Sequence, residues 1–259
     1  MSARIIADHP LAHEEVMRAW DAYEKCVVVP SGFHDPSSYV EAHPGGPGLF
    51  NYIPNRAGGH DLIHIPWAQL ERRFEGETLK PYVGRVYTLT DNRWGYGLIA
   101  GRLYMLYHGG TVVPYYGSPA RLCETIDEAE VTTLIGIASF IAAHLVGRPR
   151  PQKGTLTAII NICRPFTAEE LGRIEQHFGV KVHNHFGLAP CGTIAFSDGR
   201  ALEEHEVGDL IIPAELRGEE LFVRSPSTYP QFDLGDGWCA TGKRARIDGR
   251  RLFVLGDVA

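Results

Sequence analysis

The candidate catalytic groups of this chain gather in residues 180–193, VKVHNHFGLAPCGT. His183 and His185 are two residues apart, so on a strand their side chains lie on one face. There, one could act as a general base and the other could orient it. Cys191 could act as a nucleophile beside a basic group, and His185 is the nearest candidate for that group. The alternatives are a structural pair of hydrogen-bonded histidines and an inert buried cysteine.

A second pair of histidines, His60 and His64, has an i, i+4 spacing that binds metals when it lies on a helix. Pro66 follows closely, and the sequence offers no evident third ligand, so we expect neither a metal nor another cofactor. The five cysteines are scattered without a C-x-x-C pair, which is typical of reduced thiols in a cytoplasmic protein.

A helix and a strand must position the 180–193 segment. Thr167 and Glu170 have the spacing of a capping box at the start of this helix, and Gly179 is suited to end it. The apolar face of the helix comprises Leu171, Ile174 and Phe178. The strand that begins at Val180 then runs into a turn at Gly187. Because α/β sheets bind ligands at the carboxyl ends of their strands, we predict a functional loop after this strand.

The rest of the chain alternates strand and helix patterns. We expect strands at 83–90, 111–116 and 155–163, helices at 94–108, 118–129 and 134–146, and mostly loop in 26–50. This alternation predicts an α/β fold with a largely parallel sheet flanked by helices. After residue 205, short strands and hairpin turns predict a small C-terminal β subdomain, 206–259, attached to an α/β core, 1–205. The acidic run Glu203–Glu206 is predicted to be a solvated loop.

Composition limits the class of protein. The net charge of −6 gives no basic surface for nucleic acid. The longest apolar stretch, Leu134–Val146, is too short to span a membrane, and no signal peptide is evident. We therefore expect a soluble cytoplasmic protein with no nucleic-acid or membrane partner. A homodimer that covers an exposed edge strand is a further expectation.

The segment around Gly187 resembles the ANL adenylating enzymes, which are acyl- and aryl-CoA ligases, luciferases and peptide-synthetase adenylation domains. Their N-YG-TE motif is matched by Asn184, Phe186 and Gly187, but its Thr-Glu pair falls on Ala189 and Pro190. In the family, that glutamate holds the magnesium of ATP. Residues 218–226 (GEELFVRSP) and 236–257 (DGWCATGKRARIDGRRLFVLGD) also resemble family motifs.

The positions at which this chain departs from the family are those that bind the nucleotide in the family. The family's ribose-binding aspartate falls on Lys243, and its ribose-binding arginine has no counterpart near Asp257. The phosphate loop corresponds to Tyr52–Ile63, in which only Tyr52 and Gly58 match and Asp61 replaces the lysine. The chain ends about where the family has its hinge, so we also expect the mobile C-terminal lysine domain to be absent.

The resemblance implies an acyl or aryl pocket. Its residues would be Trp94, Tyr96, Gly97, Cys163, Arg164, Asn184, Phe186, Gly187 and Leu188. The alternative is that the aromatic residues belong to the core.

Three functions remain open. The first is an ATP-independent enzyme of a biosynthetic pathway that binds a small carboxylic acid or an acyl or aryl thioester. It would catalyse proton transfer, cyclisation or acyl transfer through His183, His185 and Cys191. The second is a non-catalytic pseudo-synthetase that serves a partner enzyme or an acyl carrier protein. The third is a genuine AMP-forming ligase.

Overall fold

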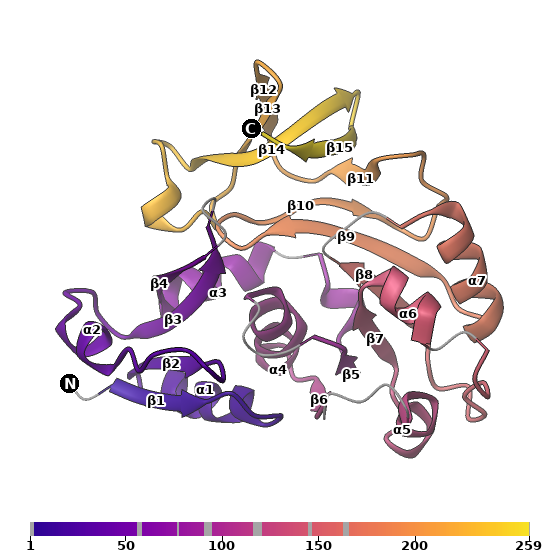
Figure 1. Ribbon diagram of the computed structural model, residues 1–259, viewed down its shortest axis with the longest axis horizontal. Coiled ribbons are helices and arrows are strands. Elements are labelled where there is room, and N and C mark those ends of the chain that lie inside the picture. The colour runs from indigo at the N-terminus through magenta and orange to yellow at the C-terminus, as the bar shows by residue number, and fades with distance from the viewer. Residues whose placement is uncertain are drawn as a thin grey trace.

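The computed structural model describes residues 3–55, 59–76, 78–90, 95–115, 121–144, 147–162 and 166–258. In these ranges the strands form two sheets (Figure 1). One has four strands in the order β1-β2-β3-β4, and the other has eleven in the order β12-β13-β14-β15-β11-β10-β9-β8-β7-β5-β6.

The smaller sheet is built near the N-terminus. Its elements are β1 (Ala3–Ala7), α1 (Ala12–Asp21), β2 (Lys25–Val29), α2 (Ser37–Ala42), β3 (Gly48–Pro54) and β4 (His60–Pro66), followed by α3 (Trp67–Gly76). β1, β2 and β3 pair in parallel, and β4 pairs antiparallel with β3. Residues 26–50 contain loops, as expected, but also β2 and α2, which the sequence did not reveal. His60 and His64 lie on the strand β4, where an i, i+4 spacing does not have the helical geometry that suits a metal.

The parallel part of the larger sheet carries the helices. Its elements are η1 (Lys80–Tyr82), β5 (Arg85–Thr88), η2 (Tyr96–Leu103), α4 (Tyr104–Tyr107), β6 (Thr111–Val113), α5 (Leu122–Glu128), β7 (Thr133–Gly136), α6 (Ala138–His144), β8 (Ala158–Ile162), α7 (Ala168–Phe178) and β9 (Val182–Leu188). The strands β6, β5, β7, β8 and β9 are all parallel. The capping box of Thr167 and Glu170 forms, and Gly179 ends α7 with a φ of 73°, as predicted.

The expected helix at 134–146 is wrong in its first part. Residues 133–136 form the buried strand β7, and the helix α6 begins at Ala138. The reason is that a strand covered on both faces is a continuous apolar run, which periodicity cannot distinguish from a buried helix.

The C-terminal strands extend the same sheet in antiparallel fashion. They are β10 (Gly192–Ser197), β11 (Glu206–Leu210), β12 (Ala214–Arg217), β13 (Glu220–Arg224), β14 (Trp238–Asp248) and β15 (Arg251–Asp257), with η4 (Pro230–Phe232) between β13 and β14. The α/β fold class is thereby confirmed, with a sheet that is parallel in one part and antiparallel in the other. A subdomain boundary at residue 205 stays a prediction.

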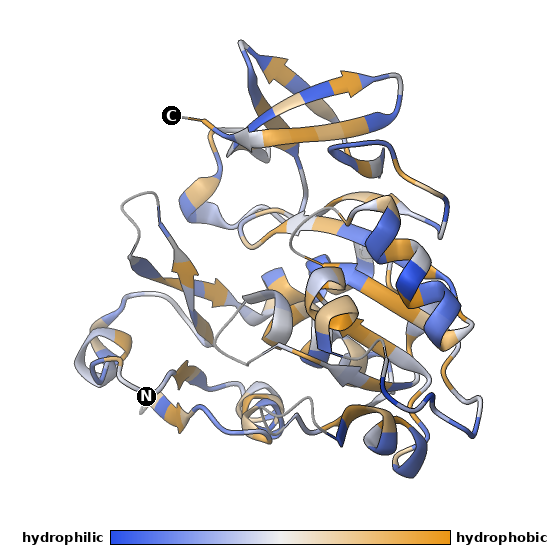
Figure 2. Cartoon of the chain, turned by 45° about the vertical axis from the view of Figure 1, so that its right-hand side comes forward, coloured by the Kyte–Doolittle hydropathy of each residue, from blue (hydrophilic) through white to orange (hydrophobic). Residues whose placement is uncertain are grey.

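Both faces of the parallel strands are buried. Ile135 and Ile160 pack in a hydrophobic cluster with residues of α1, α3, η2 and α4. Their neighbours Leu134 and Ile159 point the other way and pack with residues of α5, α6 and α7. Figure 2 shows hydrophobic residues along the central strands, between these two sets of helices. None of the described helices is long and apolar enough to cross a membrane.

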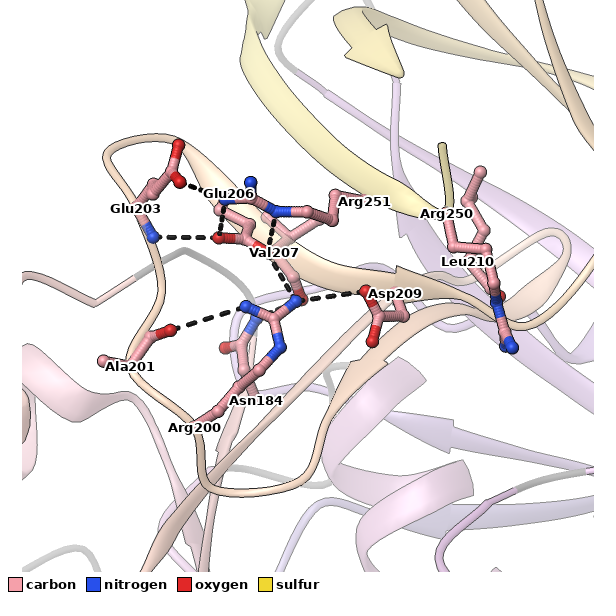
Figure 3. Close-up of polar contacts among 10 residues, drawn as sticks. All are labelled: Asn184, Arg200, Ala201, Glu203, Glu206, Val207, Asp209, Leu210, Arg250 and Arg251. Carbon is pink, nitrogen blue, oxygen red and sulfur yellow. Dashed lines mark hydrogen bonds and ion pairs between the residues drawn. The ribbon is translucent and has the colours of Figure 1, made fainter. Parts of the chain in front are cut away.

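The expectation of a solvated acidic run at 203–206 is wrong for Glu206, whose side chain is fully buried, whereas Glu203 and Glu204 are exposed (Figure 3). Arg251 donates to both of its carboxylate oxygens, at 3.1 and 2.9 Å, and Arg200 donates to one of them. The backbone N–H of Glu203 donates to it at 2.9 Å. Burial raises the pKa of Glu206, but the hydrogen bonds from Arg251 and Arg200 lower it more, so its pKa falls to about 2. This network fastens the 200–206 loop to β11 and β15.

Candidate functional site

The sheet has a topological switch point between β5 and β7, which are neighbours in it. The chain leaves β5 into η2 and α4 on one face, and leaves β7 into α6 on the other face. Ligands of α/β sheets bind at the carboxyl ends of the strands near such a point. We call this region the carboxyl-end site. It includes the end of β5, the start of η2 and the β9–β10 connection.

His185 links two hydroxyl groups in this region. Its ring is 1% exposed and lies on β9. The Nε2 atom is 2.6 Å from Thr193 Oγ1, and the Nδ1 atom is hydrogen-bonded to the hydroxyl of Tyr96 at the start of η2. A neutral imidazole donates from one nitrogen and accepts at the other, so this chain of three groups can carry a proton from end to end.

His183 lies on the same face of β9, as predicted, but it has different partners. Its Nδ1 atom is 3.1 Å from the Tyr82 hydroxyl and 3.1 Å from Asp198 Oδ1. Burial lowers the pKa of His183, and the Asp198 carboxylate opposes this effect. Among the described residues, no hydrogen bond joins His183 to His185. Tyr96 therefore orients the His185 ring, in place of the predicted His183.

Cys191 is completely buried in the cluster formed by the C-terminal strands. Its thiol is hydrogen-bonded to that of Cys239, which lowers the pKa of Cys239. The backbone N–H of Cys191 donates to the Leu188 carbonyl at 3.2 Å, within the turn that joins β9 to β10. The thiol is thus enclosed in the C-terminal cluster, and its role as a nucleophile stays a prediction.

Asn184 and Phe186 point to the opposite side of β9 from His185. The Asn184 side chain accepts a hydrogen bond from Asn161 and donates to the Val207 carbonyl at 2.7 Å, so it ties β8, β9 and β11 together. Phe186 is 5% exposed and packs in the C-terminal cluster, against which Leu188 is also partly buried. The structure thus places these three residues in the framework of the site.

The two glycines of the predicted pocket have backbone roles. A Cβ atom at Gly187 would lie 2.6 Å from the Gly192 carbonyl oxygen, so the close approach of β9 and β10 requires glycine. The Gly97 carbonyl accepts a hydrogen bond of 2.8 Å from the buried Arg102. Three further residues of the predicted pocket, Trp94, Cys163 and Arg164, lie outside the described residues.

Asn51 and Thr90 are candidate ligand-binding residues that the sequence did not reveal. Asn51 on β3 is 4% exposed, and its Nδ2 atom has no hydrogen-bond partner. A Cβ atom at Gly95 would lie 2.8 Å from this Nδ2 and 3.6 Å from the Ala189 Cβ, so β3, η2 and the β9–β10 connection converge here. The buried Oγ1 of Thr90, just after β5, also has no partner. Buried polar atoms without partners are costly, and a ligand would satisfy them.

At the positions that resemble nucleotide motifs, polar groups are bonded to each other. The Asn55 amide donates to Asp61 Oδ1 at 2.8 Å, and its oxygen accepts from the Gly59 N–H at 2.9 Å, so the described residues on the two sides of the β3–β4 turn are bonded to each other. Lys243 forms an ion pair with Asp257.

The Ala189–Pro190 turn is held by protein groups. The buried Arg73 on α3 donates to the Ala189 carbonyl at 2.9 Å and to the Tyr229 hydroxyl at 2.7 Å. The Tyr229 N–H in turn donates to the Pro190 carbonyl at 2.8 Å. Among the described residues, no group of three or more His, Cys, Asp or Glu side chains could hold a metal ion.

The fold is that of the ANL adenylating enzymes, which confirms the predicted resemblance at the level of structure. VinN superposes with a TM-score of 0.75 at 14% identity, covering 98% of this chain and 86% of that one. O-succinylbenzoate coenzyme A synthetase from Bacillus subtilis, in complex with AMP, has a TM-score of 0.75 at 15% identity, covering 98% and 68%. The anthranilate CoA ligase AuaEII, in complex with anthranoyl-AMP, has a TM-score of 0.70 at 14% identity, covering 99% and 59%. No protein-family model and no curated protein sequence matches the chain.

Proposed function

We propose that this protein binds a small carboxylic acid, or its acyl or aryl thioester, at the carboxyl-end site and acts on it without ATP. The class of ligand is supported by the structural neighbours, which include an O-succinylbenzoate coenzyme A synthetase and an anthranilate CoA ligase with anthranoyl-AMP bound. The unpartnered Asn51 amide and Thr90 hydroxyl are suited to bind the oxygen atoms of such a ligand.

The chain of Tyr96, His185 and Thr193 is the observation that carries the catalytic part of this proposal. Tyr96 is only partly buried, so its hydroxyl is the member of the chain that can meet a substrate. Its oxygen takes a proton from the substrate while its own proton passes to Nδ1 of His185. The imidazolium formed keeps its Nε2 proton, through which it donates a hydrogen bond to Thr193 Oγ1. Because Cys191 is buried elsewhere, proton transfer fits the site better than acyl transfer.

The charged groups at the positions that resemble nucleotide motifs support a reaction without ATP. A triphosphate needs backbone amides or cations around it. In the β3–β4 turn, the Gly59 amide is already bonded to Asn55, and Asp61 adds a carboxylate that repels phosphate. At the position that resembles the ribose site, Lys243 and Asp257 bind each other.

Deuterium exchange tests the proposal. Simple acyl thioesters with α-hydrogens are incubated with the protein in D₂O, and incorporation is followed by mass spectrometry. We expect exchange that falls about 100-fold in Tyr96→Phe and in His185→Gln. His183→Gln is the matched control on the same strand and should keep the exchange. Exchange that persists in both Tyr96→Phe and His185→Gln would overturn the assignment.

A second candidate is a non-catalytic protein that supports a partner enzyme or an acyl carrier protein. It is favoured by the near-complete burial of the His185 ring, both of whose nitrogens are already bonded. In that case the protein binds the acid without exchange, and a synthetase or carrier protein co-purifies with it from the native host.

We further propose that the protein is cytoplasmic, serves a biosynthetic pathway and forms a homodimer through a sheet edge. Among the described strands, β12 is an edge of the larger sheet, and its Leu216 is 40% exposed. Sedimentation of the wild type and of Leu216→Glu tests the dimer. A monomeric wild type contradicts it.

A further inference from the structure

A cleft of about 800 Å³ lies between α3 and residues 224–237, away from the Tyr96 and His185 side chains. Its volume is in the range of small-molecule sites. α3 supplies Gln69 and Arg72 to one wall, and β13 and the segment that contains η4 supply Arg224, Thr228, Asp233 and Asp236 to the other. In Figure 1, α3 lies below the loop that carries η4.

The walls of the cleft are fixed by hydrogen bonds. Gln69 is 4% exposed, and its amide donates to the carbonyls of Pro226 and Thr228 at 3.2 and 2.9 Å. Its oxygen accepts from the Arg72 guanidinium, so one glutamine joins the walls and orients that guanidinium. Thr228 Oγ1 donates to the Gly237 carbonyl at 3.0 Å.

Two guanidinium groups face this cleft without a carboxylate partner. Arg224 donates through Nε to the Asp236 carbonyl at 2.7 Å, which leaves its two terminal nitrogens available. In the described part of the chain, neither Arg72 nor Arg224 forms an ion pair. Guanidinium groups bind planar oxyanions through paired hydrogen bonds.

The acidic residues of the cleft offset only part of this charge. Asp233 Oδ1 accepts from the N–H groups of Gly235 and Gly237 at 2.8 and 3.0 Å, so backbone dipoles already compensate its carboxylate. The Asp236 carboxylate is then the one acidic group of the lining without such compensation, against two guanidinium groups.

We propose that this cleft is a second binding site, for a small molecule that carries a carboxylate or phosphate group, held between Arg72 and Arg224. The site is separate from the carboxyl-end site and does not depend on the proposed function. The two are mechanically connected, because Arg73 on α3 and Tyr229 beside Thr228 both hold the Ala189–Pro190 turn.

Calorimetric titration at low ionic strength tests this site, with inorganic phosphate, pyrophosphate and succinate as probes. We expect at least one probe to bind with a Kd of about 1 mM or tighter. Arg72→Gln and Arg224→Gln should each weaken binding about 10-fold. Asp236→Asn should tighten it a few-fold, because it removes the uncompensated negative charge of the lining. The variant should stay folded, since asparagine also tolerates the left-handed φ of 54° at this position.

The control is Arg18→Gln, which removes an exposed guanidinium on α1 and should leave the Kd unchanged. Stronger binding of phosphate or pyrophosphate than of succinate assigns the site to phosphate compounds, and the reverse assigns it to carboxylates. The proposal is wrong if no probe binds with a Kd of about 1 mM or tighter, or if Arg72→Gln binds as the wild type does. Arg72 makes a single side-chain contact on an exposed helix face, so this variant should stay folded even if Arg224→Gln does not.

Discussion

Two polar clusters of this protein differ in how completely their groups are satisfied. Around Glu206, both carboxylate oxygens are bonded, and the guanidinium groups of Arg200 and Arg251 are held in place (Figure 3). At the carboxyl-end site, the Asn51 amide and the Thr90 hydroxyl are buried without partners. A network whose polar groups are all hydrogen-bonded stabilises the fold. Buried polar groups without partners do not, and a ligand could supply the missing hydrogen bonds. We therefore assign a structural role to the first cluster and ligand binding to the second.

The largest expected effect is on stability, at Glu206. Glu206→Gln removes the buried carboxylate that Arg200 and Arg251 share, although Arg200 keeps Asp209 and Arg251 keeps Glu203 as partly exposed partners. Because the lost hydrogen bonds are charge-assisted and buried on the Glu206 side, we expect a loss of about 3 kcal/mol in the free energy of unfolding. Urea unfolding monitored by tryptophan fluorescence measures this loss. Glu204→Gln is the control, because the Glu204 side chain is 90% exposed, and it should change stability by less than about 0.5 kcal/mol. Equal effects of the two substitutions on stability would contradict the structural role assigned to the Glu206 cluster.

The same carboxylate predicts a response to acid. The pKa of Glu206 is lowered to about 2 in the folded protein, from an ordinary value of 4.5. A carboxyl group with a lowered folded pKa stabilises the protein above its unfolded pKa. That stability is lost as the pH falls from about 4.5 towards 2. The unfolding free energy of wild type should drop more steeply over this window than that of Glu206→Gln.

Buried histidines predict a second acid response, at higher pH. Burial lowers the pKa of His13 and of His64 to about 4, with smaller contributions from Arg102 and His43 respectively. The folded state holds both rings neutral while the unfolded state takes up protons below pH 6.5. Stability therefore falls as the pH drops, by about 2 kcal/mol per histidine between pH 7 and 5. His64→Asn should flatten this dependence and His34→Asn, at an exposed position, should not.

At the carboxyl-end site, we expect a substitution to reduce proton exchange far more than it reduces the free energy of unfolding. Tyr96→Phe removes one hydrogen bond to His185 and should cost about 1–2 kcal/mol in unfolding free energy, while it removes most of the proton exchange. Paired measurements of unfolding and deuterium incorporation check this. A variant that loses stability and exchange in the same proportion would place Tyr96 in the framework.

The smallest expected effect is at Asn51. This variant tests most specifically whether the carboxyl-end site differs from the Glu206 cluster. Because its Nδ2 has no partner, Asn51→Leu should raise the unfolding free energy by about 1 kcal/mol and weaken binding of a carboxylic acid. Asn161→Leu is the matched control, since that buried amide is bonded to the Ala138 N–H at 2.7 Å and to Asn184. It should lose about 2 kcal/mol. A destabilised Asn51→Leu would contradict the role given to Asn51.

Local signals were enough to predict some of these features. The capping box of Thr167 and Glu170 and the end of α7 at Gly179 depend on residues close in sequence, and both are confirmed. The shared face of His183 and His185 follows from strand geometry alone. The α/β class follows from the alternation of strands and helices.

Features that depend on distant partners were not predicted. Glu206 is buried because Arg251, 45 residues further along, reaches it, and an acidic run carries no sign of this. β2 lies in a segment rich in glycine and proline, and its pairing with β1 and β3 is a long-range property. The missing partner of Asn51 is likewise visible only once β3, η2 and the β9–β10 connection have been brought together.

We infer that this protein binds a small acid at the carboxyl-end site and that no nucleotide takes part. Calorimetry with a panel of small aromatic and aliphatic acids, each titrated with and without ATP-Mg, can separate these two ligands. We expect at least one acid to bind with a Kd that ATP-Mg does not change, and ATP-Mg alone to give no heat of binding. Micromolar binding of ATP-Mg, followed by release of pyrophosphate when the acid is added, would contradict this inference and identify a working ligase.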